Sequence, residues 1–235
     1  MAHIKALVFD VFGTLVDWRT SIAHHAEQQL APLGVRDDWL AFADDWRAQY
    51  QPAMEEVRTG RLGDVKLDTL HRRNLDVVLR ARGHHAINDA TRARLNLAWH
   101  ALQAWPDVAQ GLAALRQQFV LGPCSNGHIA LMANLARHNG WHWDAILGAE
   151  LAQDYKPKAV VYTTAAAALD MAPHEVMMVA AHSNDLQAAA ASGLRTAFVA
   201  RPHEYGPNTG EPRATVPVDF EASDLPHLAR LLRLE

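Results

Sequence analysis

The chain has 235 residues, of which 49% are apolar and 20% charged, and its formal net charge is −4. This length suits one large domain or a core domain with a smaller insertion, and the composition is ordinary for a globular protein. The mild acidity gives no reason to expect a nucleic acid or an anionic membrane as partner. The single cysteine excludes an internal disulfide and a cysteine-based zinc site.

No run of 18 apolar residues occurs, and no signal peptide precedes the apolar run that starts at Ile4. We therefore expect a cytoplasmic protein without a membrane partner.

The first expected element is a buried strand over Ile4–Phe9, which delivers Asp10 into a turn at Gly13-Thr14. In open α/β sheets, ligands bind at the carboxyl ends of the strands. A carboxylate in that place can act as a nucleophile and form a covalent ester. The alternative is an aspartate that only caps the next element.

From about residue 18 to 98 the apolar spacing is helical, and glycines and prolines interrupt it. No strand is expected in this block. It is therefore predicted to be a helical insertion between the first strand and the rest of the chain.

After Trp105-Pro106-Asp107 the pattern changes to alternating helices and strands. Strands are expected over 119–124, 145–147, 176–180 and 196–199, and helices over 107–117, 128–138, 159–169 and 185–192. This alternation predicts an α/β fold with a Rossmann-like parallel sheet core and helices on both faces. The predicted core domain comprises 1–17 and 99–235, and the stretch 201–217 is expected to be a surface loop.

Polar residues follow four of the predicted strands or their connections. They are Asp10, Ser125-Asn126-Gly127, Lys156-Pro157 and the segment His182-Ser183-Asn184-Asp185. Parallel strands place these loops on one edge of the sheet, so a carboxylate, a hydroxyl, an amide, a cation and a second carboxylate are expected to converge there.

The order and spacing of these motifs resemble the haloacid dehalogenase superfamily. The resemblance identifies Asp10 as the nucleophile of its first motif, Ser125 as its second and Lys156 as its third, with an acidic fourth motif at the strand end. It also implies that the helical insertion, 18–98, is a cap domain.

Most members of that superfamily are magnesium phosphatases, and this sequence departs from them twice. The second aspartate of their first motif is replaced by Phe12, and the Gly-Asp of their fourth motif by Ala180-Ala181, so that only Asp185 is retained. A hard dication needs several oxygen ligands. These departures predict that no metal is bound and that phosphorus is not attacked.

A narrower resemblance is to the metal-independent L-2-haloacid dehalogenases, which need no cofactor. Four residues carry it: the aromatic Phe12, Asn126 beside the motif serine, Tyr162 six residues after the lysine, and Arg47 on a cap helix. This resemblance implies that short 2-haloacids are hydrolysed to 2-hydroxy acids and halide. Related enzymes are often dimers, so a homodimer is compatible with it.

The resemblance also implies a role for each site residue. Asp10 would attack the carbon that bears the halogen, and Lys156 would lower the pKa of Asp10. Ser125 would hold the substrate carboxylate. The other predicted substrate contacts are Val11, Phe12, Thr14, Tyr162, and the halide-binding pair Arg47 and Asn126. Lys156 and Asp185 would position the water that hydrolyses the ester.

The fourth motif of this subfamily usually contains Ser-Ser-Asn-x-x-Asp, whereas this chain has Ala180-Ala181-His182 before Ser183. We expect His182 to provide hydrogen bonding or base chemistry near the ester.

Four alternatives remain open. Two concern function: a magnesium phosphatase with a degenerate fourth motif, and a catalytically silent binding module on this fold. Two concern single residues: Tyr162 as ordinary core packing, and Arg47 in a solvated ion pair with Asp44 or Asp45.

Overall fold

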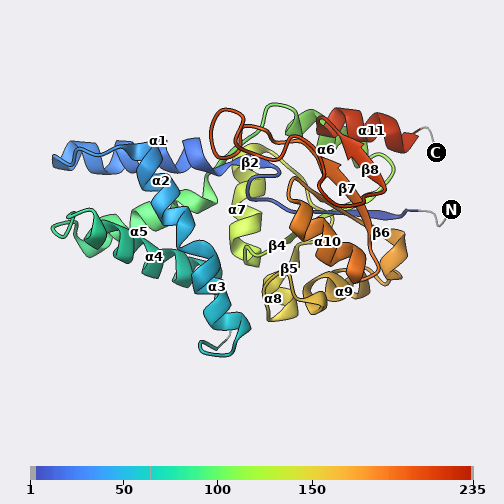
Figure 1. Ribbon diagram of the computed structural model, residues 1–235, viewed down its shortest axis with the longest axis horizontal. Coiled ribbons are helices and arrows are strands. Elements are labelled where there is room, and N and C mark those ends of the chain that lie inside the picture. Colours follow the sequence, from blue (N-terminus) through green and yellow to red (C-terminus); the bar gives the residue numbers. More distant parts are fainter. Residues whose placement is uncertain (1–3, 64, 234–235) are drawn as a thin grey trace. The chain divides into compact units, whose positions relative to one another are not determined.

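A six-stranded parallel sheet forms the centre of the larger of two compact units in the computed structural model, which describes residues 4–63 and 65–233 (Figure 1). In sheet order the strands are β5 (Leu147–Gly148), β4 (Val120–Ser125), β1 (Ala6–Phe9), β6 (Val176–Ala180), β7 (Arg195–Val199) and β8 (Phe220–Ala222). Every neighbouring pair runs parallel. The predicted α/β fold class is confirmed.

Helices cover both faces of the sheet. They are α6 (Val108–Leu115), α7 (Ile129–Asn139), α8 (Ala149–Ala152), α9 (Ala159–Ala168), α10 (Ser183–Ala191) and α11 (Leu225–Arg233). Figure 1 shows α9 and α10 on one side of the sheet and the contacting pair α6 and α11 on the other.

Strands β1 and β6 lie at the centre of the core, and every residue in both is fully buried. A parallel strand covered on both faces needs an uninterrupted apolar run, which is what the Ile4–Phe9 pattern indicates. Alternate residues Ala6 and Val8 face the cluster formed with α9 and α10. This burial fixes the position at which β1 ends and Asp10 begins the loop.

The ends of most predicted strands and helices lie within three residues of the observed ends, but some ends are shifted and some elements were not predicted. The strand expected over 145–147 is Leu147–Gly148, and β1 begins at Ala6 rather than Ile4. The sequence patterns also did not predict β8, α8, α11, or the two-stranded antiparallel pair β2 (Val16–Asp17) and β3 (Gln103–Ala104). These strands have two or three residues each, which is too short to show a period.

The second unit spans Trp18–Leu102 and contains helices but no strand among its described residues. Its helices are α1 (Trp18–Leu30), α2 (Trp39–Ala48), α3 (Tyr50–Arg58), α4 (Leu67–Ala81) and α5 (Asp89–Asn96), with short 3-10 helices at Ala31–Leu33 and Leu97–His100. Trp46, His71 and Trp99 form an aromatic cluster in its core.

The larger unit consists of the residues up to Asp17 and those from Gln103 onward. The roles expected for the two units, catalytic core and cap, stay predictions, as do the predicted boundaries. Residues 1–3, 64 and 234–235 of the predicted domains lie outside the described residues. None of the helices in the described part of the chain has both the length and the apolar character needed to span a membrane.

Gly148 is required where β5 meets the end of β4. Its φ is +111°, and a Cβ there would lie 2.3 Å from the carbonyl oxygen and 2.6 Å from the backbone nitrogen of Ser125. Such a backbone conformation is almost restricted to glycine. The close approach holds β5 against the strand end that carries Ser125.

Gly148→Ala is therefore expected to lower the free energy of unfolding by about 3 kcal/mol or more, because backbone atoms must move. Gly140→Ala is the matched control: it also has a positive φ, but nothing lies within 4 Å of its added Cβ. The control should lose about 1 to 2 kcal/mol from backbone conformation alone. Urea unfolding measures both, and equal losses would contradict the steric account.

Candidate functional site

Four polar segments meet at the carboxyl edge of the sheet. Asp10 directly follows β1, Ser125 ends β4, and His182 precedes α10 after β6. Because β4, β1 and β6 are adjacent and parallel, their carboxyl ends lie side by side. Lys156 reaches the same place from the loop before α9.

A buried lysine joins two buried carboxylates at this edge. The Nζ atom of Lys156 lies 2.8 Å from Oδ1 of Asp10 and 2.5 Å from Oδ2 of Asp185. Burial alone would lower the pKa of Lys156, but the two carboxylates outweigh it and raise that pKa well above its usual value. The lysine therefore stays charged and supplies a fixed cation beside Asp10.

The second oxygen of Asp10 also receives hydrogen bonds. The hydroxyl of Thr14 donates to Oδ2 over 2.8 Å, and Nδ1 of His182 lies 3.0 Å from the same oxygen. The backbone N–H of Ala181 in turn donates to Thr14 and fixes its hydroxyl. Burial raises the pKa of Asp10, but the charge of Lys156 and the hydrogen bond from His182 outweigh it and hold that pKa well below its usual value.

His182 connects Asp10 to another buried carboxylate. Its Nε2 lies 2.8 Å from Oε2 of Glu204, whose side chain is buried. Burial lowers the pKa of His182, but hydrogen bonds to Asp10 and Glu204 and the charges of both raise it to about 10. At neutral pH the ring is an imidazolium that donates from both nitrogens. The geometry supports the hydrogen-bonding role expected for His182 and does not support a base in this state.

Asp185 accepts a hydrogen bond from a buried tyrosine. The hydroxyl of Tyr162 donates to Oδ1 of Asp185 over 2.5 Å, and the Tyr162 side chain is fully buried in the core. Burial of Asp185 outweighs the charge of Lys156 and raises the pKa of Asp185. Substrate contact by Tyr162 stays a prediction. Its ring packs in the core because that face of α9 is turned inward, and its hydroxyl positions Asp185.

The segment after β4 is held by its own polar groups. The backbone N–H of Gly127 donates to the hydroxyl of Ser125, and the backbone N–H of Lys156 donates to Oδ1 of Asn126. Asn126 therefore supports the lysine loop through its side-chain oxygen. The paired register of β1 and β4 ends at Phe9 and Pro123, so Asp10 and Ser125 each lie just past the paired residues.

The remaining residues predicted around the nucleophile lie in the loop after β1. Val11 and Phe12 are both buried, and the carbonyl of Val11 accepts the N–H of Leu15 and closes the loop. Trp105 braces the same loop through its indole N–H, which donates to the carbonyl of Gly13. Substrate contact by Val11, Phe12 and Thr14 stays a prediction.

Arg47 lies on α2, in the other unit. Its guanidinium lies 4.0 Å from the ring centre of Tyr50. Asp44 forms an ion pair with Arg19, and Asp45 forms one with Arg82. That Arg47 faces Asp10 stays a prediction.

The loop 201–217 supplies contacts that the sequence patterns did not reveal. Arg201 donates to the carbonyl of Thr14 and pairs with Asp107, Glu204 binds His182, and Glu211 accepts from the N–H and hydroxyl of Ser183. This loop follows β7 at the carboxyl edge of the sheet. The rule that singled out the other loops applies equally here, and it was the signal that could have identified Glu204.

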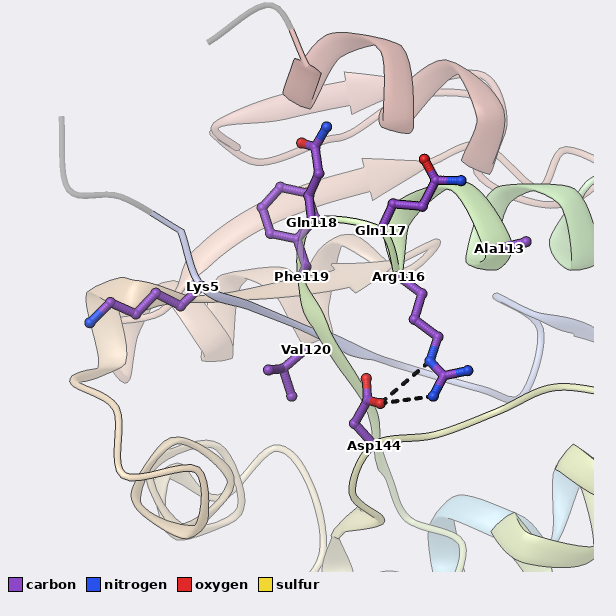
Figure 2. A pocket seen from close by; sticks show the side chains of 8 residues that line it. All are labelled: Lys5, Ala113, Arg116, Gln117, Gln118, Phe119, Val120 and Asp144. Atoms are coloured by element: carbon purple, nitrogen blue, oxygen red, sulfur yellow. Dashed lines mark hydrogen bonds and ion pairs between the residues drawn. The ribbon is translucent and has the colours of Figure 1, made fainter.

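A surface hollow lies at the other end of the strands. Figure 2 shows its lining, which includes Lys5, just before β1, and Val120, the first residue of β4. An ion pair between Arg116 and Asp144 crosses it. Because these residues stand at the amino ends of the strands, the hollow is remote from Asp10.

Comparisons with known proteins agree with this geometry. A family model described as haloacid dehalogenase-like hydrolase matches residues 4–193. A solved defluorinating L-2-haloacid dehalogenase aligns with a TM-score of 0.95 and 43% identity over 98% of this chain and 95% of its own. A second solved L-2-haloacid dehalogenase aligns with a TM-score of 0.91 and 44% identity over 97% of this chain and 99% of its own.

Two relatives show similar identity but have different activities. (S)-2-haloacid dehalogenase 1 of Pseudomonas sp. (strain CBS-3) is 30% identical over 239 residues, covering 99% of this chain and 98% of the relative. Phosphoglycolate phosphatase of Chromobacterium violaceum is 30% identical over 203 residues, covering 82% of this chain and 83% of the relative. Site residues must therefore decide between the two chemistries.

The pKa of His182 gives a stability test. This pKa is 6.5 in the unfolded chain and about 10 in the folded protein. The stabilisation that protonated His182 gives the fold is therefore complete below pH 6.5 and is lost as the pH rises through 10. Between these values the free energy of unfolding should fall more steeply in the wild type than in His182→Gln, by at most about 1.4 kcal/mol per pH unit.

Urea unfolding across this range measures the difference. His174→Gln, which removes an exposed histidine, should follow the wild type. Parallel curves for the wild type and His182→Gln would contradict a protonated His182.

Proposed function

The chain is a haloacid dehalogenase-like hydrolase of the L-2-haloacid dehalogenase subfamily, and we propose that it hydrolyses short L-2-haloalkanoic acids to 2-hydroxy acids through an ester on Asp10. The observation that carries the proposal is the state of Asp10: a carboxylate kept ionised at a strand end, with Lys156 on one oxygen and His182 on the other. The relative with 43% identity is a defluorinating enzyme, and we include fluoride among the leaving groups.

In the first step, Oδ1 of Asp10 attacks C2 of the substrate in line with the carbon–halogen bond. The new C2–Oδ1 bond forms as the carbon–halogen bond breaks, and the halide leaves with the electron pair. Oδ2 becomes the carbonyl oxygen of the ester, since it already receives hydrogen bonds from Thr14 and His182. Attack from the side opposite the halide inverts the configuration at C2.

The groups assigned to the substrate follow from the donors at this edge. Ser125 and the backbone N–H groups after it would hold the substrate carboxylate. The N–H₂ end of Asn126, together with Arg47, would stabilise the departing halide as its negative charge grows. Two donors on the halide and a separate carboxylate site would place C2 near Oδ1.

In the second step, water adds to Cγ of Asp10. The Cγ–Oδ1 bond then breaks, and Oδ1 leaves as the hydroxyl oxygen of the 2-hydroxy acid. One proton of the water goes to that hydroxyl, and the other goes to solvent by way of Asp185, whose raised pKa suits a proton acceptor. Asp10 regains its carboxylate with one oxygen from water.

The phosphatase alternative conflicts with the residues of the site. In phosphatases of this superfamily, the position of Phe12 holds an aspartate that acts as general acid toward the leaving group, and the position of Ala181 holds an aspartate that binds magnesium. Both oxygens of Asp10 face cations or a hydroxyl donor rather than an open coordination position. These residues do not fit a magnesium site, so no step uses a metal. The intact Asp10, Lys156 and Asp185 also argue against a silent binding module.

Asp10→Asn tests the proposal directly. The amide cannot form the ester, so halide release from L-2-chloropropionate should fall at least about ten-thousand-fold. Asp170→Asn, an exposed position with positive φ that suits asparagine, is the matched control and should keep full activity. Halide electrodes or ion chromatography measure the product.

Two outcomes would overturn the proposal. One is turnover by Asp10→Asn at the wild-type rate. The other is an enzyme that releases phosphate from phosphoglycolate only with magnesium and releases no halide. A chelator should leave halide release by the wild type unchanged.

A further inference from the structure

Glu204 is the least exposed carboxylate in the neighbourhood of Asp10, with 1% of its surface accessible. It lies in the loop after β7, and its Oε2 is 2.8 Å from Nε2 of His182, whose Nδ1 is 3.0 Å from Asp10. A continuous chain of hydrogen bonds therefore runs from a buried carboxylate, through an imidazole, to the nucleophile.

The loop after β1 is shaped to admit this carboxylate. Gly13 has a φ of +87°, and a Cβ on it would lie 2.1 Å from Oε1 of Glu204. The loop that follows the nucleophile thus leaves room for Glu204 only because residue 13 has no side chain. Arg201, three residues before Glu204, holds the same two loops together through the carbonyl of Thr14.

We propose that Glu204 is a positioning residue for the dehalogenation: it acts through His182 and keeps Nδ1–H of that ring directed at Oδ2 of Asp10 after the ester has formed. This inference rests on the proposed function, and it assigns Glu204 to the second step rather than the first.

Glu204 is assigned to the second step because the charge of Asp10 changes during the reaction. In the free enzyme the imidazolium faces two carboxylates, those of Asp10 and Glu204. Ester formation removes the negative charge of Asp10, and Glu204 remains as the anion in contact with the ring. A buried imidazole that faced only an ester would lose its proton readily, because burial disfavours its charged form.

The retained proton has a use in ester hydrolysis. When water adds to Cγ of Asp10, negative charge develops on Oδ2, where the N–H of His182 and the hydroxyl of Thr14 already point. Donors aligned in advance with a developing oxyanion accelerate such a step. The charged groups around the ring are Asp10 and Glu204 in contact, and beyond them Lys156, Asp185, Arg201 and Glu211.

Glu204→Gln separates this role from a structural one. The variant keeps the shape of the side chain and loses its charge, so hydrolysis of the ester should slow by about a hundredfold while ester formation stays fast. Halide should then appear as a burst of one equivalent followed by slow turnover. The alkaline limb of kcat should move to lower pH by about one unit or more.

Two further variants control the test. Glu204→Asp keeps the charge and should restore much of the rate and the alkaline limb. Glu211→Gln removes a carboxylate of the same loop that binds Ser183 rather than His182, so it should leave the alkaline limb in place.

A second readout does not depend on turnover. Nitrogen NMR of the free enzyme should show a protonated His182 ring at neutral pH, with its signal identified by the loss of that signal in His182→Gln. In Glu204→Gln the ring should lose this proton at a lower pH than in the wild type. A folded Glu204→Gln with no burst, an unmoved alkaline limb and an unchanged His182 titration would overturn the inference. If the wild type itself releases no halide, the proposed function fails, whatever the variants do.

Discussion

The site depends on the balance of charge around one buried carboxylate. Asp10 lies where a fully buried strand ends, and an unpaired charge there would be strongly disfavoured. Lys156 and His182 supply two cations in contact with it, and Asp185 and Glu204 balance those cations in turn. The resulting network keeps Asp10 ionised while its side chain stays buried. In the proposed mechanism, ester formation removes the negative charge of Asp10, and Glu204 is then the carboxylate that remains in contact with His182.

The local sequence predicted the parts of this network that adjoin strands. Asp10, Lys156 and Asp185 each lie beside an apolar run whose length and composition identify a strand or its crossover helix, and parallel topology then brings them together. The same rule points to the loop after β7 but does not single out Glu204 within it. No sequence pattern near Glu204 indicates a contact with His182. The two side chains meet only because the loop after β7 folds back over the loop after β1.

Tyr162 shows what sequence spacing alone cannot predict. Its spacing from Lys156 was informative, but spacing does not reveal whether a side chain points into a core or toward a ligand. The structure turns its ring inward and gives its hydroxyl to Asp185. Strand β8 was not predicted for a simpler reason: a strand of three residues has too few positions to show alternation. Residue types can therefore identify the chemistry before tertiary contacts assign each role.

Mass spectrometry of Asp10 after a single turnover in heavy-oxygen water tests the central claim most directly. The ester mechanism predicts that the peptide containing Asp10 gains heavy oxygen, while the first 2-hydroxy acid released carries the original oxygen of Asp10. Heavy oxygen found directly in that first product, with an unlabelled Asp10 peptide, would mean that water attacks the substrate itself and would contradict the account.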